Sequence, residues 1–194
     1  CNCALVWDPD TGTGVVVDPG DEATRIRGRV EALGFRPEMI LLTHGHFDHV
    51  GAAKELQDLW GCPVLLAEAD RHLVEALELQ TSLFGMPPVP EPRITTLPLD
   101  GEPFGLKVLP TPGHSQGSVG FFGWMESGPV VFCGDTLFRG GVGRTDLTGG
   151  SWKRLETSIR EQLYTLPPET RAVPGHGPET SIGEEIASNP FVRG

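Results

Sequence analysis

The sequence predicts an α/β fold built as a single domain over residues 1–194. Short apolar runs alternate with segments of helical periodicity along the whole chain, which is typical of layered α/β proteins. The length suits one domain with a full hydrophobic core. The 26 glycines and 18 prolines are spread along the chain instead of marking one linker. We therefore expect loops between many short elements, and no internal domain boundary.

Two kinds of signal define the elements of the first half. Turn residues separate apolar runs, as in the stretch from Asp8 to Gly12, and glycines end helices, as at Gly34 and Gly61. On these grounds we expect a hairpin from residues 3–7 and 14–18, a helix at 21–34, a buried strand at 39–42, a helix at 50–60, a strand at 63–66, a helix at 68–79, and a Pro-rich loop at 80–98.

The second half repeats this alternation. Ser151 is a suitable N-cap for a helix over residues 151–165, which is the last helix we predict. Strands are expected at residues 106–109, 118–122, 130–132 and 171–173.

Composition and charge exclude several classes of partner. A formal net charge of −11 disfavours a nucleic-acid or anionic membrane partner, because phosphate binding needs a basic face. No apolar run approaches the ~20 residues of a membrane span, and no leader pattern is present. The four cysteines form no CxxC pair, which predicts reduced thiols in the cytoplasm. The opening CNCALVWD reads as mid-strand without an initiator Met, so we expect a truncated N-terminal strand.

The run THGHFDH, directly after the buried strand at 39–42, has the pattern of a metal site. His44, His46, Asp48 and His49 fall within six residues. Imidazole and carboxylate are the ligands that a borderline divalent ion such as zinc prefers. A tight loop can present His44 and His46 to one ion, with Asp48 and His49 facing a neighbouring position. The competing interpretation is a solvated histidine-rich turn.

Three further candidate ligands occur in a shared context. His114, Asp135 and His176 each follow a predicted strand and a glycine, in TPGHS, FCGDT and PGHGP. A glycine lets the backbone turn sharply and point the next side chain outward from the strand end. Four strand-end sites of this kind in one short chain favour the metal-site interpretation over a histidine-rich turn.

The series HxHxDH, GHS, GD and GH, in this order over nearly the whole chain, resembles the metallo-β-lactamase superfamily. The resemblance implies an αββα four-layer sandwich with the metal site at one edge between the two β-sheets. It also implies two divalent ions, zinc first, with iron or manganese as alternatives. By this resemblance, one ion is held by His44, His46 and His114, the other by Asp48, His49 and His176, and Asp135 bridges the two.

A finer similarity concerns LFRGGVGRTDLTGGS and PGHGPETSIGEEIASNPF, which resemble segments of the short, single-domain glyoxalase II-like branch. It implies a hydroxyacylglutathione hydrolase-like thioesterase in which a metal-bridging hydroxide attacks a small-molecule acyl thioester such as S-lactoylglutathione. Arg144 matches a basic residue that helps to hold glutathione in that branch. Asp146 replaces a frequent aromatic residue, and we expect no C-terminal helical glutathione-binding domain. Because of these two departures, glutathione as the leaving part of the substrate is one of several possibilities.

Residues around the predicted centre carry further hypotheses. Asp48 is our candidate for orienting the nucleophile and carrying its proton, a role that bulk water could also fill. Arg144 lies in a Gly-rich loop suited to an anionic substrate group, and an ion pair with Asp146 is the competing interpretation. The loop at 80–98 either walls one side of the site or packs on the surface. His72 lacks the glycine-turn context, so we expect no function for it.

Other functions stay open at this point. One is a sulfur dioxygenase acting on glutathione persulfide, with one iron held by the equivalents of His44, His114 and Asp135. A lactonase or another ester hydrolase of the same fold is a second, although Tyr164 lies in the last predicted helix and supplies no evident lactonase tyrosine. A metal-binding protein without turnover is a third. β-Lactamases are less favoured, because their well-known zinc class places Cys at the position of Asp135.

Overall fold

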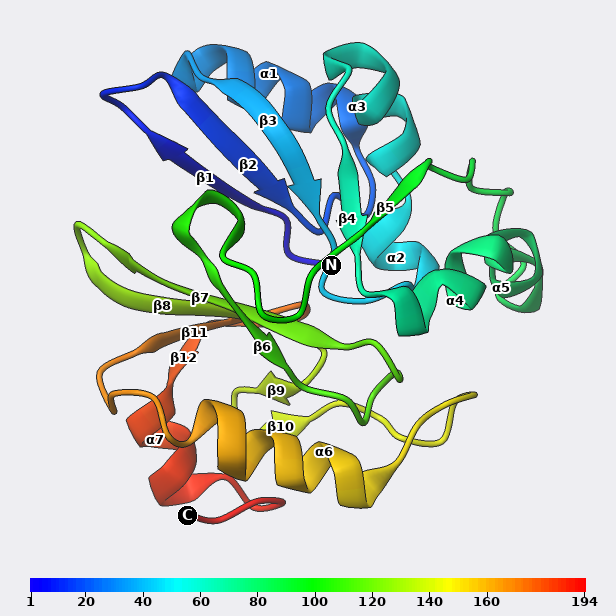
Figure 1. Cartoon of the computed structure of the whole chain (residues 1–194). Coiled ribbons are helices and arrows are strands. Elements are labelled where there is room, and N and C mark those ends of the chain that lie inside the picture. The colour runs from blue at the N-terminus through cyan, green and yellow to red at the C-terminus, as the bar shows by residue number, and fades with distance from the viewer. The chain divides into compact units, whose positions relative to one another are not determined.

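The computed structural model describes residues 1–194 and divides into two compact units, Cys1–Leu97 and Pro98–Gly194. Each unit has its own five-stranded sheet and its own core of buried aliphatic side chains (Figure 1). The single domain over residues 1–194 stays a prediction. No helix is long and apolar enough to cross a membrane.

Unit 1 is a mostly parallel sheet with the strand order β1-β2-β3-β4-β5. The first two strands form the predicted antiparallel hairpin, and β2 through β5 run parallel. Its elements are β1 (Ala4–Asp8), β2 (Thr13–Val17), α1 (Ala23–Leu33), β3 (Arg36–Leu41), α2 (Phe47–Val50), α3 (Ala53–Trp60), β4 (Val64–Leu66), a 3₁₀ turn (Glu68–Asp70), α4 (Arg71–Glu75), α5 (Leu77–Leu83) and β5 (Ile94–Thr96).

Helices α1 and α3 cover one face of this sheet (Figure 1). Val30 of α1 and Leu56 of α3 pack with Ile40 of β3 in a cluster of buried side chains. Each such aliphatic side chain contributes roughly 1.5–3 kcal/mol when fully buried. Gly34 ends α1 in the left-handed region, at φ 73°, as the sequence predicted.

Three boundaries in unit 1 differ from the prediction. The helix predicted at 50–60 is divided into α2 and α3, because the Ala52 N–H donates to the carbonyl of Pro19 at 2.8 Å and so leaves the helical hydrogen-bond ladder. The predicted loop at 80–98 is wrong at both ends, since α5 continues to Leu83 and β5 pairs with β4. Strand β3 begins three residues before the predicted start, where polar residues pair with β2.

Unit 2 is a mixed sheet with the strand order β12-β11-β8-β7-β6, accompanied by the small β9–β10 hairpin. Its elements are a 3₁₀ turn (Pro103–Gly105), β6 (Lys107–Pro110), β7 (Val119–Met125), β8 (Gly128–Gly134), β9 (Leu137–Phe138), β10 (Gly141–Val142), α6 (Trp152–Ser158), a π-helical turn (Ile159–Leu163), β11 (Arg171–Pro174), β12 (Thr180–Ser181) and α7 (Ile182–Ser188).

Helices α6 and α7 cover one face of the unit 2 sheet (Figure 1). Leu155 of α6 and Ile182 of α7 are fully buried in the same cluster as Val131 of β8. Ser151 caps α6 as predicted, because its Oγ accepts a hydrogen bond from the backbone N–H of Arg154.

Two expectations for unit 2 are wrong. The regular part of the helix predicted at 151–165 ends at Ser158 and continues as a π-helical turn. The last helix is α7, which follows Tyr164, so Tyr164 does not lie in the last helix. The Tyr164 hydroxyl donates a hydrogen bond to the carbonyl of Val192, which ties down the C-terminal segment.

Candidate metal centre

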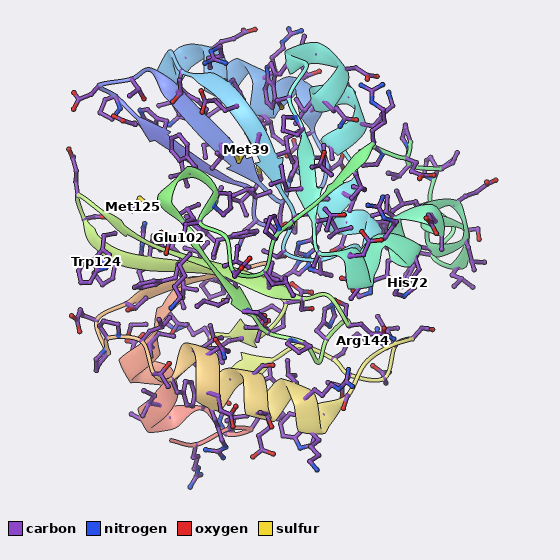
Figure 2. The ribbon with its side chains drawn as sticks, viewed as in Figure 1. Met39, His72, Glu102, Trp124, Met125 and Arg144 are labelled. Carbon is purple, nitrogen blue, oxygen red and sulfur yellow. The ribbon has the colours of Figure 1, made fainter.

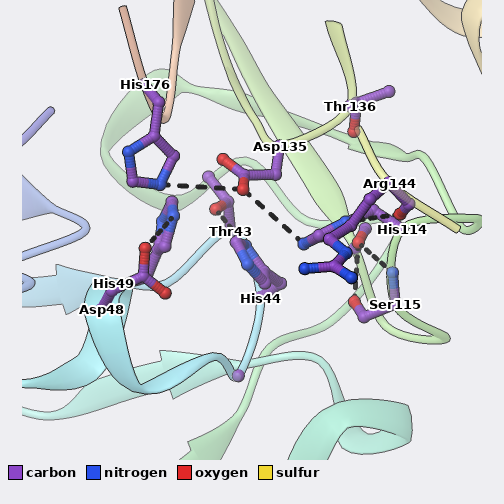
Figure 3. A network of polar contacts seen from close by, with 12 residues as sticks. Thr43, His44, Asp48, His49, His114, Ser115, Asp135, Thr136, Arg144 and His176 are labelled. Atoms are coloured by element: carbon purple, nitrogen blue, oxygen red, sulfur yellow. Dashed lines mark hydrogen bonds and ion pairs between the residues drawn. The ribbon is translucent and has the colours of Figure 1, made fainter. Parts of the chain in front are cut away.

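The histidines and the aspartate of the THGHFDH run gather in unit 1, two of them in the loop after β3 and two in helix α2. We call His44, His46, Asp48 and His49 the first ligand group. The His44 ring lies 4.7 Å from the His46 ring and 4.1 Å from the His49 ring, centroid to centroid. His49 Nε2 is 3.8 Å from Asp48 Oδ2 (Figure 3). His44 and His49 are buried, whereas His46 and Asp48 are partly exposed, so the group reaches from the core to solvent.

Asp18, directly after β2, orients two of these imidazoles. Its Oδ2 accepts hydrogen bonds from His49 Nδ1 at 2.9 Å and from the Thr43 hydroxyl at 2.7 Å. Since the Thr43 hydroxyl proton is used on Asp18, Thr43 Oγ1 accepts from His44 Nδ1 at 3.1 Å. Both rings are thereby fixed with a lone pair on Nε2, the form in which histidine binds a metal.

Asp18 was not predicted, because the segment VVVDPG reads as an ordinary strand end and turn. The available signal was its position: β2 and β3 are parallel neighbours, so their carboxyl ends lie at the same edge of the sheet. Asp18 adopts the left-handed region, with φ 49°, which Asp tolerates better than most residues. An acidic residue at the end of a strand that neighbours a ligand-bearing strand therefore indicates a side chain that can orient the ligands.

The backbone of the ligand loop is held by two side chains from later in unit 1. Gly45 N–H donates to Asp70 Oδ2 at 3.1 Å, and Phe47 N–H donates to Gln80 Oε1 at 3.1 Å. Gln80 Nε2 donates to the carbonyls of Leu73, at 2.7 Å, and Gly45, at 3.3 Å. Helix α5 therefore fixes this loop through one amide side chain, a role that the sequence did not reveal.

The second ligand group consists of His114, Asp135 and His176 in unit 2. Asp135 Oδ2 lies 3.7 Å from His114 Nε2 and 3.8 Å from His176 Nε2 (Figure 3). His114 is buried, Asp135 is partly exposed, and the His176 side chain is 45% exposed. One carboxylate oxygen therefore faces two imidazole nitrogens, which is the arrangement expected of a carboxylate shared between ligand positions.

Strand topology explains why these three residues meet. Strand β11 runs parallel to β8, and β6 runs in the same direction because it and β8 are both antiparallel to β7. The three residues follow the carboxyl ends of β6, β8 and β11, which lie at one edge of the sheet. The strand–glycine pattern in the sequence picked out these three residues, and their role as ligands stays a prediction.

The loop after β10 orients His114. Its Nδ1 donates to the carbonyl oxygen of Arg144 at 2.8 Å, and since a carbonyl can only accept, the lone pair is on Nε2. The Arg144 side chain makes two hydrogen bonds to Asp146, at 2.7 and 2.8 Å. This hydrogen bonding lowers the pKa of Asp146 to about 2 and raises the pKa of Arg144. The ion pair that competed with a substrate role for Arg144 is thus confirmed, and the substrate role stays a prediction.

The donor set of the two groups fits divalent metal ions. Three rings, those of His44, His49 and His114, have Nδ1 engaged and Nε2 as the acceptor nitrogen. Carboxylates accompany them in both groups, and this mixture of nitrogen and oxygen donors is what zinc, iron and manganese accept. The burial of His44 and His49 does not fit the solvated turn that was the alternative, and ligation stays a prediction.

Other reactive side chains lie outside the ligand groups. His72 is exposed on α4 (Figure 2), and its lack of function stays a prediction. The four cysteines are free thiols, as expected for a protein without disulfides. Burial raises the pKa of the Cys133 thiol to about 12, and the negative charge of Asp135 acts in the same direction. A thiolate nucleophile is therefore not available at this position.

Comparison with known proteins identifies a family. The sequence profile of the Metallo-beta-lactamase superfamily matches residues 1–176. The probable metallo-hydrolase YqgX of Bacillus subtilis (strain 168) is 42% identical over 186 residues, which cover 93% of this chain and 87% of that protein. The hydroxyacylglutathione hydrolase GloC of Haemophilus influenzae is 40% identical over 200 residues, which cover 98% of this chain and 92% of that protein.

Two solved structures extend the similarity to three dimensions. TTHA1623 in a di-iron-bound form is 41% identical with a TM-score of 0.89, and the match covers 98% of this chain and 94% of that chain. BLEG-1, described as a B3 metallo-beta-lactamase, is 36% identical with a TM-score of 0.89, and the match covers 100% of this chain and 94% of that chain. These matches confirm the fold class predicted from the sequence.

Proposed function

This chain belongs to the metallo-β-lactamase superfamily and is a metallohydrolase, and from that premise we propose that it is a binuclear enzyme that cleaves acyl thioesters of small molecules. The observation that carries the proposal is the fixed orientation of three imidazoles. His44, His49 and His114 each have Nδ1 engaged, so that Nε2 is presented for a metal. Buried histidines held in this form by separate partners are costly to build unless they serve as ligands.

The two ligand groups supply the donors of one centre in this proposal. Family resemblance assigns one ion to His44, His46 and His114, and the other to Asp48, His49 and His176. Asp135 is the bridging carboxylate, which is supported by the position of its Oδ2 close to two imidazole nitrogens within its own group. The di-iron-bound form of TTHA1623 supports a two-ion centre and leaves iron beside zinc and manganese as the metal.

The metal ions would lower the pKa of a coordinated water from about 15.7 toward ~7 and polarise the acyl carbonyl. Asp48 has the position to orient this water and carry its proton, because its partly exposed carboxylate lies 3.8 Å from His49 Nε2. A thiol has a pKa of about 8.5, so it departs as a thiolate without a strong general acid. Thioesters therefore suit a site whose proton-transfer groups are carboxylates.

Arg144 is the proposed contact for an anionic part of the substrate. Its carbonyl is bound to His114, which places the residue beside the second ligand group. Its side chain is 55% exposed, and its guanidinium, which holds Asp146, is a planar group of the kind that carboxylates bind. The 40% identity to GloC supports a glutathione-linked acyl thioester such as S-lactoylglutathione as the first substrate to test.

The experiment combines metal analysis with a substrate screen. Protein purified without added metal is expected to contain two divalent ions per chain and to hydrolyse S-lactoylglutathione or a simpler acyl thioester above the free-metal background. His114→Ala is expected to lose metal and activity, whereas His72→Ala, an exposed histidine on α4, is the matched control. Absence of thioester turnover together with unchanged metal content in His114→Ala would sink the proposal. One iron per chain with oxygen uptake on glutathione persulfide would indicate the dioxygenase instead.

β-Lactam hydrolysis is the second candidate, because the structure of BLEG-1 matches the whole chain. A lactam is also an acyl compound, but its nitrogen must be protonated on departure, which demands more from the acid that Asp48 would supply. The ratio of kcat/KM for a thioester to that for a β-lactam separates the candidates. We expect the thioester to be preferred.

A further inference from the structure

A buried polar cluster in unit 2 lies outside both ligand groups. Glu185, on helix α7, is 2% exposed. Its Oε2 accepts hydrogen bonds from Gly140 N–H at 3.0 Å and Asn189 Nδ2 at 2.7 Å, and its Oε1 accepts from the Thr180 hydroxyl at 2.7 Å. Asn189 Nδ2 also donates to the carbonyl of Gly141 at 3.1 Å. We call Thr180, Glu185 and Asn189 the C-terminal clamp, because they hold the β9–β10 hairpin from the C-terminal helix.

The chain that leaves this hairpin lies directly against the second ligand group. A Cβ at Gly143 would overlap the carbonyl oxygen of Asp135 and lie 3.3 Å from His114 Cβ, so the backbone is packed onto both ligands. The next residue, Arg144, accepts the hydrogen bond from His114 Nδ1. The position of this segment therefore determines the orientation of His114.

The hairpin also contacts the third ligand of the group. The Phe138 ring of β9 makes an edge contact with the His176 ring, with centroids 6.5 Å apart. All three ligands of the second group are thus in contact with residues 138–144. In unit 1, by contrast, the buried side chain of Asp18 performs the orienting role.

The chemistry of the clamp indicates that it fixes the exact position of the β9–β10 hairpin and does not merely attach it to the rest of unit 2. Burying a carboxylate is costly unless every oxygen is hydrogen-bonded, and apolar packing could hold a surface hairpin without that cost. A carboxylate with three donors restricts the hairpin to the narrow distances and angles of hydrogen bonds. The clamp therefore fixes the hairpin in one place.

We propose that Glu185 and Asn189 are positioning residues for the second ligand group, acting through the β9–β10 hairpin on the Nδ1 partner of His114 and on the backbone of Asp135. This inference rests on the metal centre of the proposed function. Loss of an outer partner of a metal ligand typically costs 10–100-fold in metal affinity, and the clamp acts one step further out. We expect an effect of about tenfold, the lower end of that range.

The test uses four variants of the full chain. Glu185→Ala removes both acceptor oxygens and with them three hydrogen bonds, and Thr180→Val removes one donor. Glu185→Gln can keep the clamp: its amide oxygen accepts from Gly140 and Asn189 while its amide nitrogen donates to Thr180, whose hydroxyl can turn to Glu184 Oε2, 3.1 Å away. Glu161→Ala removes an exposed acidic residue of unit 2 as the control.

Two readouts are measured for each variant. The first is the half-time of metal release to a chelator, which we expect to fall about tenfold in Glu185→Ala, a few-fold in Thr180→Val, and not in Glu185→Gln or Glu161→Ala. The second is the ¹⁵N spectrum of the His114 ring in metal-free protein. It is expected to report a proton fixed on Nδ1 in the wild type and in Glu185→Gln, and a tautomer mixture in Glu185→Ala and Thr180→Val.

A lower melting temperature alone, with unchanged metal release and an unchanged His114 spectrum, would overturn the positioning role. If Glu185→Ala does not fold, the comparison of Thr180→Val with Glu185→Gln decides, and equal values in both readouts overturn the inference. The His114 spectrum requires no metal. It therefore tests the clamp even if the wild type binds no metal, a result that would refute the proposed function instead.

Discussion

The two ligand groups place the same kinds of donor by different means. The first draws its four residues from one short loop and orients two of them through the carboxylate of Asp18. The second draws its three residues from three strand ends and orients His114 through a backbone carbonyl. The first group therefore depends on the identity of one side chain, and the second on the position of a backbone segment.

This difference predicts how each group responds to substitution. A side-chain partner can be removed by a single change, whereas a carbonyl partner can only be displaced by moving the chain. We expect single substitutions around the first group to give large, local effects. Around the second group, only the ligands themselves should be as sensitive.

Asp135→Ala is expected to have the largest effect, because one oxygen of this carboxylate faces both imidazoles of the second group. The loss of metal content and of kcat/KM should exceed the 10–100-fold that is typical of outer partners. Metal analysis and steady-state kinetics measure it, with His72→Ala as control. Retention of full metal content and activity would mean that Asp135 is not a ligand.

Asp18→Asn should come next. Asp18 Oδ2 accepts from His49 and Thr43, so an amide nitrogen at that position would face two donors and favour the wrong tautomer of His49. We expect a 10–100-fold loss of metal affinity. Thr43→Val, which removes the partner of His44 and one donor to Asp18 but leaves the Asp18–His49 hydrogen bond, should give a smaller loss. Equal affinities in wild type and Asp18→Asn, measured by competition with a chelator, would contradict the orienting role.

The sequence predicted the ligand residues of both groups better than their supports. The first group is contiguous, so its pattern is visible without a fold, and the second is marked by a glycine after each strand. Asp18 and Gln80 are separated from the loop they hold by 25 or more residues. Only the parallel pairing of β2 and β3 brings Asp18 there, and only the packing of α5 brings Gln80.

The elements that were not predicted were missed for two physical reasons. Strands β5 and β12 have three and two residues, which is too short for an alternating pattern to be recognised. Helix α7 has a buried Glu185 on its inner face, so a charged residue interrupts the apolar periodicity that would have revealed it. The feature that hid this helix from the sequence analysis is the one from which we infer the clamp.

Gln80→Leu is predicted to have an intermediate effect on the first group. The leucine would leave the Phe47 N–H and the carbonyls of Gly45 and Leu73 without their partner, and each such group costs about 1–3 kcal/mol when buried. Because the three groups are only part-buried, the free energy of unfolding in urea should fall by about 1–3 kcal/mol in total. Ser82→Ala, an exposed change in the same helix, is the control. Unchanged stability would show that α5 does not hold the loop.

Asp146→Asn should have the smallest effect, because the Arg144–Asp146 pair is exposed and such pairs are weak. Without its carboxylate partner, Arg144 should bind an anionic thioester a few-fold more tightly, which lowers KM, while KM for an uncharged thioester stays constant.

The pH dependence of this effect follows from the pKa of Asp146, which the hydrogen bonds from Arg144 lower from 3.8 to about 2. Because this folded-state pKa is depressed, the pair is complete above the unfolded value and is lost only as the pH falls through about 2. The ratio of the KM of the wild type to the KM of the variant should therefore stay constant from roughly pH 5 to pH 9. This range begins roughly one unit above the ordinary Asp pKa of about 3.9. A ratio that changes across this range would require another titrating group, and equal KM values for both substrates would remove Arg144 from the substrate site.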